Sequence, residues 1–265
     1  MLSRKSVQTL LLPLGFTAGL SCSPTNLPPI GSEAKSFQVE DDEKTLWQAS
    51  EQIARRLEKI GLLYEDRDLE AYLGGVARKL LGKRLEGTQL TLRVKVVKDP
   101  FLNAFALPDG AIYFHSGLLA RMENEAQMAT VLGHELTHFT HRHSARDMRN
   151  AQNKFIAARI LQVMLVTTPF GVFAEQLPAV WAAASISGYS KELETEADEG
   201  GLRYMVEAGY DPKESVKAFD ALKQSREETK AKEPFFFGTH PRLEERIENH
   251  LRLLKEEHRR AASGC

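Results

Sequence analysis

The sequence predicts an α+β domain that is mainly helical, with a small β-sheet beside one helix that carries a metal-binding pattern. Three observations support this fold class. Apolar residues recur at helical spacing over much of the chain, and one short stretch alternates strictly between apolar and polar residues. The pattern H-E-x-x-H lies within a largely apolar segment at residues 130–139. The 265 residues are enough for one well-packed domain with short appendages.

The charge balance and the cysteine content limit which partners and which kinds of cysteine site the sequence predicts. The chain has 35 Lys and Arg residues against 36 Asp and Glu residues, a formal net charge of −1. This balance gives no indication of nucleic acid as a partner, and we expect none. The two cysteines, Cys22 and Cys265, make neither a disulfide framework nor a cysteine metal site.

Residues 1–22 are typical of an export signal, with two basic residues before an apolar run that is short for a membrane span. The sequence Gly19-Leu20-Ser21-Cys22 resembles a bacterial lipoprotein cleavage box, although the large residue usual three positions before the cysteine is here Gly19. We predict that Cys22 is lipidated. A signal peptide with an incidental cysteine, or an uncleaved anchor, is the alternative. Ser23 permits sorting to the outer membrane, so we predict an exported, periplasmic protein that a lipid anchors to that membrane.

Three further segments complete the predicted organisation of the chain. Residues 23–42 contain several Pro and Ser residues and are predicted to be a flexible linker. Residues 43–258 carry the periodic apolar patterns and are predicted to form the folded domain. Residues 259–265 are predicted to be a C-terminal tail.

Two amphipathic helices are expected at the start of this domain. In the first, apolar residues at helical spacing over 46–60 share one face, and Gly61 ends the helix. In the second, the same spacing runs over 69–80, and Gly82 ends the helix. Both are expected to pack against the core.

Three short strands are expected next. Residues 90–96 alternate strictly, and residues 103–107 and 111–115 flank the turn Pro108-Asp109-Gly110 as a β-hairpin. A sheet edge beside a metal can hold an extended peptide by main-chain hydrogen bonds. Ile112, Tyr113 and Phe114 are the candidates for such an edge, and an ordinary interior strand is the alternative.

The H-E-x-x-H pattern predicts a zinc site on a helix. His134 and His138 are four residues apart and lie on one helical face, so that both rings can reach one Zn²⁺ ion. Glu135 is offset by about 100° around the helix and can act as a general base for a zinc-bound water. We interpret His141 and His143 as structural or solvated residues, although His141 is spaced to face the same side.

The apolar stretch at residues 155–188 is interrupted by charged residues and by Pro169 and Pro178. It therefore contains no uninterrupted span of the roughly 20 residues that a membrane helix needs. We interpret it as two helices joined by a bend, forming a lid beside the cleft; a hairpin that contacts the membrane is the alternative.

A catalytic zinc needs a third protein ligand, and the helix expected from about Ser190 offers several carboxylates. Glu194 and Asp198 are four residues apart, so Glu194 can bind the metal while Asp198 accepts a hydrogen bond from a ligand histidine. Glu192 and Glu196 are expected to point elsewhere. The chemistry alone leaves the three glutamates in competition.

Two glycines interrupt this helix, and a final helix follows later in the chain. Gly200 and Gly201 cost helix stability, which is tolerable where a second helix approaches closely. Gly209 is expected to end the helix. Residues 243–254 have apolar residues on one face and charged residues on the other, so we expect a packing helix there.

The motifs in order resemble the gluzincins of metallopeptidase family forty-eight, which include HtpX-like, CAAX prenyl and BepA/LoiP-like proteases. The resemblance covers about residues 43–255. It rests on the two zinc motifs, on the sequence at 103–110, on Ala208-Gly209-Tyr210-Asp211-Pro212 and on Thr239-His240-Pro241. The compact, exported members match best, because the multiple membrane helices of some groups and the C-terminal helical repeats of others are not found here.

The resemblance implies a zincin-like fold and one zinc ion per chain. It implies that His134, His138 and Glu194 bind the zinc, that Glu135 is the base, and that Asp198 orients a ligand histidine. His240 matches a histidine that in some relatives occupies the open zinc position at rest or stabilises the transition state, and both roles stay open.

The implied function is that of a zinc metalloendopeptidase of the cell envelope. It would hydrolyse peptide bonds of misfolded or unassembled proteins as part of protein quality control. The alternative is a zinc-bound chaperone-like or adaptor protein with latent or no proteolytic activity. The intact Glu135 argues against the alternative, because a purely structural site needs no base. The sequence does not predict cleavage specificity or oligomeric state.

Overall fold

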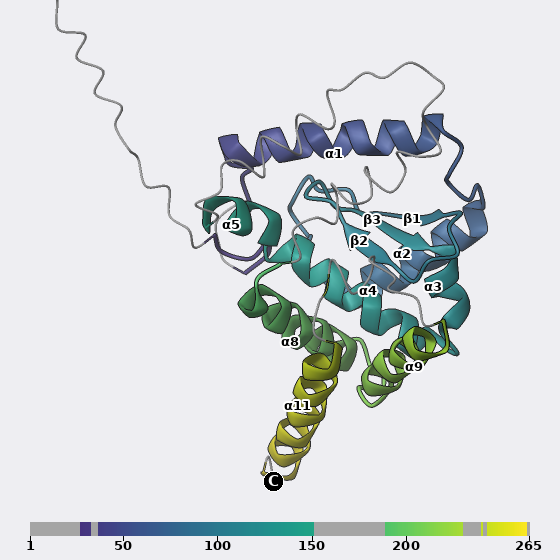
Figure 1. Cartoon of the computed structure of the whole chain (residues 1–265). Helices are drawn as coiled ribbons and strands as arrows, with labels where there is room; N and C mark the ends of the chain where they lie inside the picture. Colours follow the sequence, from purple (N-terminus) through teal and green to yellow (C-terminus); the bar gives the residue numbers. More distant parts are fainter. Residues whose placement is uncertain (1–26, 33–36, 151–188, 230–239, 241–242, 264–265) are drawn as a thin grey trace, which may run out of the picture.

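The computed structural model describes residues 27–32, 37–150, 189–229, 240 and 243–263. The predicted signal peptide with Cys22 and the apolar stretch at 155–188 lie outside these residues. The predicted mainly helical α+β fold is confirmed (Figure 1). The elements in order are α1 Asp41–Lys59, α2 Arg67–Leu81, β1 Arg93–Val97, β2 Ala104–Ala106, β3 Ala111–His115, α3 Ser116–Arg121, α4 Glu125–Thr140, α5 His143–Asn150, α8 Lys191–Glu207, α9 Glu214–Thr229 and α11 Leu243–Ser263.

The three described strands form one sheet in the order β1-β3-β2. β1 pairs with β3 in parallel, and β2 pairs with β3 antiparallel, so the predicted hairpin around Pro108-Asp109-Gly110 is confirmed. The strand expected at 90–96 begins only at Arg93.

The prediction that Ile112, Tyr113 and Phe114 form an exposed sheet edge is wrong. These residues belong to β3, which lies in the middle of the sheet with a partner on each side, and all three side chains are buried. The run Ala-Ile-Tyr-Phe-His is mostly apolar, and all five of its residues are buried, as in a strand covered on both faces. The alternative, an interior strand, is correct.

Helices cover both faces of the sheet, and alternate residues of β3 face the two layers. Ile112 and Phe114 join the larger apolar cluster together with residues of α2 and α4. Tyr113 joins a second cluster with Phe105 of β2 and Leu57 of α1. Figure 1 shows α1 on one side of the sheet and α2 and α4 on the other. The helix with the H-E-x-x-H pattern therefore lies directly against the sheet.

Residues 27–32 and 37–40, which belong to the predicted linker, lie against the folded domain. Leu27 and Ile30 are buried, and the Ile30 amide donates a hydrogen bond to the carbonyl oxygen of Thr140 at the end of α4.

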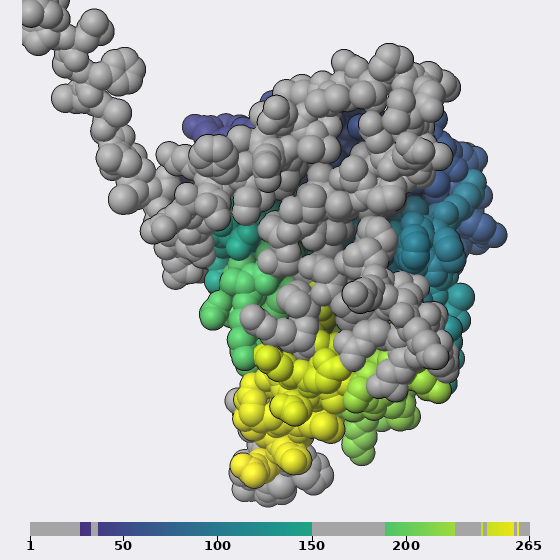
Figure 2. All heavy atoms as spheres, in the orientation of Figure 1, coloured from purple at the N-terminus to yellow at the C-terminus, as the bar shows by residue number. Residues whose placement is uncertain are grey.

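At the C-terminal end, α11 continues through Ser263, into the segment predicted as a tail. Figure 2 shows α11 beside α9 at one end of the molecule. Within the part of the chain that the structure describes, no helix is both long and apolar enough to cross a membrane.

Candidate metal centre

The site is built on α4, whose residues from Gln127 to Thr140 are all buried. Asn124 caps the helix by accepting a hydrogen bond from the Gln127 amide. His134 and His138 lie on one face, and their Nε2 atoms are 2.9 Å apart. Two ring nitrogens this close, both away from water, are expected where lone pairs converge on a cation.

Helix α8 adds a carboxylate to this pair. Glu194 is buried, and its carboxylate oxygens lie 3.5 Å from the Nε2 atoms of His134 and of His138. Of the three glutamates that the sequence left in competition, Glu194 is the one that the structure brings to the two histidines. Glu192 is exposed, and Glu196 has other partners.

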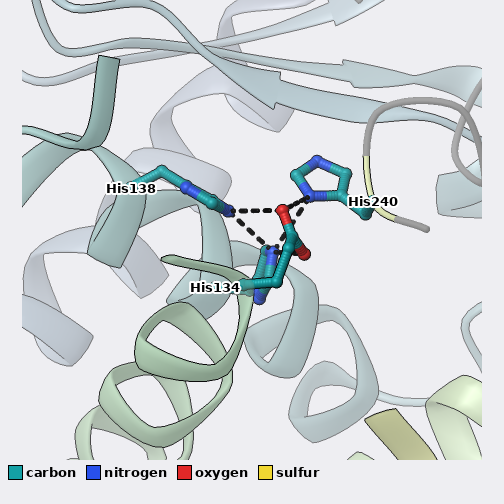
Figure 3. Close-up of side chains that lie close together, drawn as sticks. His134, His138 and His240 are labelled. Atoms are coloured by element: carbon teal, nitrogen blue, oxygen red, sulfur yellow. Dashed lines mark hydrogen bonds and ion pairs between the residues drawn. The ribbon is translucent and has the colours of Figure 1, made fainter. Parts of the chain in front are cut away.

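His240 supplies a fourth donor atom from a distant part of the chain. Its Nδ1 atom lies 3.1 Å from His134 Nε2 and 2.9 Å from Glu194 Oε1 (Figure 3). The five separations given above, each with one or the other Glu194 oxygen where that residue is involved, range from 2.9 to 3.5 Å. Zinc at 2.0–2.1 Å from each donor of a tetrahedron would need separations of about 3.3 Å. The donor set fits a zinc ion in both chemistry and spacing.

Asp198 orients the first of the two helix histidines. Its Oδ1 atom lies 2.9 Å from His134 Nδ1, so the proton of that ring is held on Nδ1 and the lone pair of Nε2 faces the donor cluster. The buried Arg246 of α11 lies 2.6 Å from the same oxygen. The Nη2 atom of Arg246 is also 2.9 Å from His134 Nδ1, but this donor is satisfied by its shorter contact with the Asp198 carboxylate. Burial acts to raise the pKa of Asp198, yet Arg246, His250 and His134 together outweigh burial and hold that pKa far below the ordinary range.

The protonation states of His138 and Glu194 suit a cation site. At His134, burial acts to lower the pKa, but the carboxylates of Asp198 and Glu194 raise it, so a cation would compete with a proton there. Burial, together with the neighbouring His134, lowers the pKa of His138 well below its ordinary value, so this ring is neutral. Burial also acts on Glu194, but the histidines around it outweigh this effect and hold its pKa well below the ordinary value. An anionic carboxylate and neutral imidazole rings are the forms that bind zinc.

Glu135 lies beside the donor cluster without belonging to it. The side chain is 1% exposed, and its Oε1 atom is 3.3 Å from Nε2 of His240. Burial raises the pKa of Glu135. A buried carboxyl with a raised pKa next to a metal site can both take up and return a proton.

Glu196 differs from the sequence-based prediction, whereas His141 and His143 are structural, one of the two interpretations given for them. Glu196, expected to point elsewhere into solvent, accepts a hydrogen bond from His141 Nδ1 at 2.6 Å and pairs with Arg146 at 2.8 Å. His143 is fully buried, and its Nδ1 atom lies 2.9 Å from Nδ1 of His138.

The sequence-based reasoning missed Arg246 and Tyr189. Tyr189 stacks on the His138 ring, with ring centroids 4.0 Å apart. The sequence did offer one signal for Arg246. It lies about one helical turn after the apolar Leu243, on the packed side of the last helix, where a charged residue needs a buried partner.

Comparison with known proteins gives a consistent result. A model of the family described as Peptidase family M48 matches residues 55–253. The chain is 27% identical over 229 residues to a beta-barrel assembly-enhancing protease homologue from Vibrio cholerae, covering 84% of this chain and 46% of that protein. It is 25% identical over 230 residues to the beta-barrel assembly-enhancing protease of Escherichia coli K12, covering 85% of this chain and 46% of that protein. It is 35% identical over 138 residues to the mitochondrial metalloendopeptidase OMA1 of Arabidopsis thaliana, covering 52% of this chain and 27% of that protein. The chain thus spans less than half the length of these three relatives.

Proposed function

The chain belongs to peptidase family M48, a family of metallopeptidases, and from this premise we propose that it is a zinc-dependent endopeptidase. One observation carries the proposal. Two imidazole rings from α4, a carboxylate from α8 and a third imidazole lie within bonding reach of a single ion, with the carboxylate of Glu135 beside them.

In the proposed mechanism, His134, His138 and Glu194 would hold a zinc ion. When bound, zinc would activate a water molecule and polarise the carbonyl of the peptide bond to be cleaved. Glu135 takes a proton from the water and delivers it to the departing amine. Burial supports this role, because the raised pKa of Glu135 makes its carboxylate a stronger base than an exposed one.

His240 is proposed to occupy the fourth position around the metal in the resting protein. Support comes from the position of its Nδ1 atom among the donors, 2.9 Å from Glu194 Oε1. A catalytic zinc keeps one position open for water or substrate. His240 must therefore withdraw before cleavage, which makes the resting protein latent.

The substrate is proposed to bind in extended form beside β2 rather than β3. Among the described strands, β2 lies at one edge of the sheet and pairs only with β3. Ala106 and Leu107, at the end of β2, line a small cavity together with His138. A peptide added to this edge by main-chain hydrogen bonds would run past the donor cluster.

The proposed setting is the bacterial envelope, with misfolded or unassembled proteins as substrates and Cys22 as the site of a lipid anchor to the outer membrane. This rests on the similarity to proteases named for β-barrel assembly and on the signal-like residues 1–22. Protein quality control is the corresponding role.

The test is proteolysis of casein by the zinc-loaded chain, with Glu135→Gln beside it and zinc content measured for both. Glu192→Gln, which removes an exposed carboxylate of α8, is the matched control. We expect cleavage to be lost in Glu135→Gln at unchanged zinc content and kept in the control. Cleavage by wild type that persists equally in Glu135→Gln would contradict the proposed mechanism.

A zinc-bound chaperone-like or adaptor protein is the second candidate, because four protein donors around one ion are typical of structural zinc sites. His240→Ala separates the two. If His240 only keeps an enzyme latent, this variant cleaves casein faster than wild type does. If zinc is bound by wild type and His240→Ala but neither cleaves, the second candidate is favoured.

A further inference from the structure

The second ring nitrogen of His138 has a partner that the proposed mechanism does not use. While Nε2 of His138 faces the donor cluster, its Nδ1 atom lies 2.9 Å from Nδ1 of His143. The two rings are nearly perpendicular, at 81°, and both are buried. Where no cation lies between them, two ring nitrogens this close need one proton, carried by one of the rings.

The chemistry of the site decides which ring carries this proton. Nε2 of His138 must present its lone pair to a metal, so in the neutral ring the proton lies on Nδ1. His143 must then accept through its own Nδ1. Its proton therefore lies on Nε2, which faces Glu196 Oε2 at 3.5 Å and has no closer hydrogen-bond partner among the described residues.

Glu196 supplies a fixed negative charge at the end of this chain of contacts. Arg146 and His141 hold its two oxygens at 2.8 and 2.6 Å. Because the guanidinium of Arg146 lies within 2.9 Å of both oxygens, the carboxylate is held as an anion and attracts the Nε2 proton of His143.

We propose that His143 is a positioning residue that fixes the tautomer and the ring orientation of His138, with Glu196 as the anionic end of the chain. His138 would thus receive through one intervening imidazole the support that His134 receives directly from Asp198. The inference rests on the proposed metal site, and it does not require that the protein cleave peptides.

A second metal ion bound by His141, His143 and Glu196 is the competing interpretation, because ligand atoms of these residues lie close enough to share one. The guanidinium of Arg146 argues against it. Arg146 already contacts both oxygens of Glu196, at 2.9 and 2.8 Å, and a second cation would have to displace it.

The test measures zinc affinity of the full chain by competition with a chelator, and the unfolding midpoint of the metal-free protein. His143→Leu removes the acceptor, whereas His143→Asn keeps an oxygen close to the position of Nδ1. His141→Leu is the matched control, since His141 contacts the same carboxylate but makes no hydrogen bond to His138. Glu196→Gln removes the charge and keeps the shape.

We expect zinc affinity to fall about 10- to 100-fold in His143→Leu, the range found when such partners of ligand histidines are removed. His143→Asn should restore most of the loss, and Glu196→Gln should show a smaller fall. His141→Leu leaves Arg146 on Glu196 and should stay closest to wild type. In the cobalt-loaded protein, the visible absorption bands should shift in His143→Leu and be restored in His143→Asn, a change that a loss of packing alone would not cause.

Three results would overturn the inference. One is unchanged zinc affinity in His143→Leu, even if the metal-free protein unfolds more easily. Another is an equal loss of affinity in His143→Asn and His143→Leu. The third is two zinc ions bound per wild-type chain and one per His143→Leu chain, which would identify a second metal site. If wild type itself binds no zinc, the proposed function fails, and this outcome is distinct from the three above.

Discussion

Replacing Gly201 by alanine should destabilise the protein and weaken the metal site, although the same change stabilises most helices. Gly201 lies inside α8 at the point where α8 crosses α4. A Cβ atom built on Gly201 would lie 2.8 Å from the backbone nitrogen of His134 and 2.9 Å from the carbonyl carbon of Gly133. Both neighbours are backbone atoms of the buried helix α4, so neither can rotate out of the way as a side-chain atom could.

The size of the effect follows from these distances. Ordinary contact begins near 3.4 Å, so the added methyl group requires α8 to withdraw by about 0.6 Å. Overpacking of this kind costs about 1–3 kcal/mol. The higher helix propensity of alanine returns about 1 kcal/mol. A withdrawal of 0.6 Å also exceeds the roughly 0.2 Å tolerance of a metal–ligand distance, so zinc bound through Glu194 should be held less tightly.

The matched control is Gly75→Ala in α2. Gly75 also lies inside a helix, but a Cβ atom there would meet nothing within 4 Å. We expect Gly75→Ala to stabilise the protein by about 1 kcal/mol, and Gly201→Ala to be about 1–3 kcal/mol less stable than that control.

Urea unfolding gives both free energies, and a chelator competition gives zinc affinity. The reasoning is refuted if Gly201→Ala is as stable as Gly75→Ala and binds zinc as wild type does. That result would mean that α4 and α8 can separate at no cost.

Three further predictions concern the parts of the fold that surround the site. Glu43→Ala should lower the free energy of unfolding by about 3–5 kcal/mol in urea titrations, because it leaves the buried guanidinium of Arg142 without its carboxylate; a loss below 1 kcal/mol would contradict this. Burial raises the pKa of Tyr113 to about 12, so between about pH 10 and 12 the unfolded chain loses this proton before the folded chain does, and stability falls as pH rises. Tyr113→Phe should reduce this fall by up to about 1.4 kcal/mol per pH unit, measured as the difference in unfolding free energy between pH 9 and 11. Chelation of zinc should lower the unfolding temperature, because only the folded chain gathers the four donors; identical midpoints with and without chelator would speak against a bound metal.

The elements that depend on local pattern could be predicted from the sequence. The helix that carries His134 and His138 and the hairpin around Pro108-Asp109-Gly110 lie where spacing and turn residues placed them. The close approach allowed by Gly200 and Gly201 was also predicted, and the added Cβ atoms at both positions would overlap α4. The helix and the hairpin are determined by interactions between residues close in sequence. The close approach of the helices follows from the absence of a side chain at each glycine.

The arrangement of the strands could not be predicted in the same way. The sheet places β1 beside β3 although β2 lies between them in the sequence. Nothing local to Ile112, Tyr113 or Phe114 specifies which strand pairs with the second side of β3. That choice depends on how α2 and α4 pack beneath the sheet.

The position of His143 depended on a single backbone conformation. In a continuous helix His143 would lie about 140° around the axis from His138, and His141 would be nearer to the metal face. Helix α4 instead ends at Thr140, and Arg142 has a φ of 57°, which is rare for a residue with a side chain. The turn brings His143 back beside His138. The ion pair of Arg142 with Glu43 of α1, 99 residues away, supports this turn, so the local sequence gave no sign of it.

Helices α4 and α8 supply different parts of the metal site, so the contact between them affects the site more than any single residue does. Helix α4 supplies two of the three rings of the donor cluster. Helix α8 supplies the three carboxylates that act on these two rings: Glu194 within the donor cluster, Asp198 on His134, and Glu196 through His143. Rings on one helix and carboxylates on the other can meet only at a fixed separation. Gly133 and Gly201 set that separation by letting backbone meet backbone, and Gly200 leaves room for the Thr137 side chain. A shift of α8 would therefore change the ligand and both supporting carboxylates together, and we expect metal affinity to respond more steeply to such a shift than to the loss of either supporting carboxylate alone.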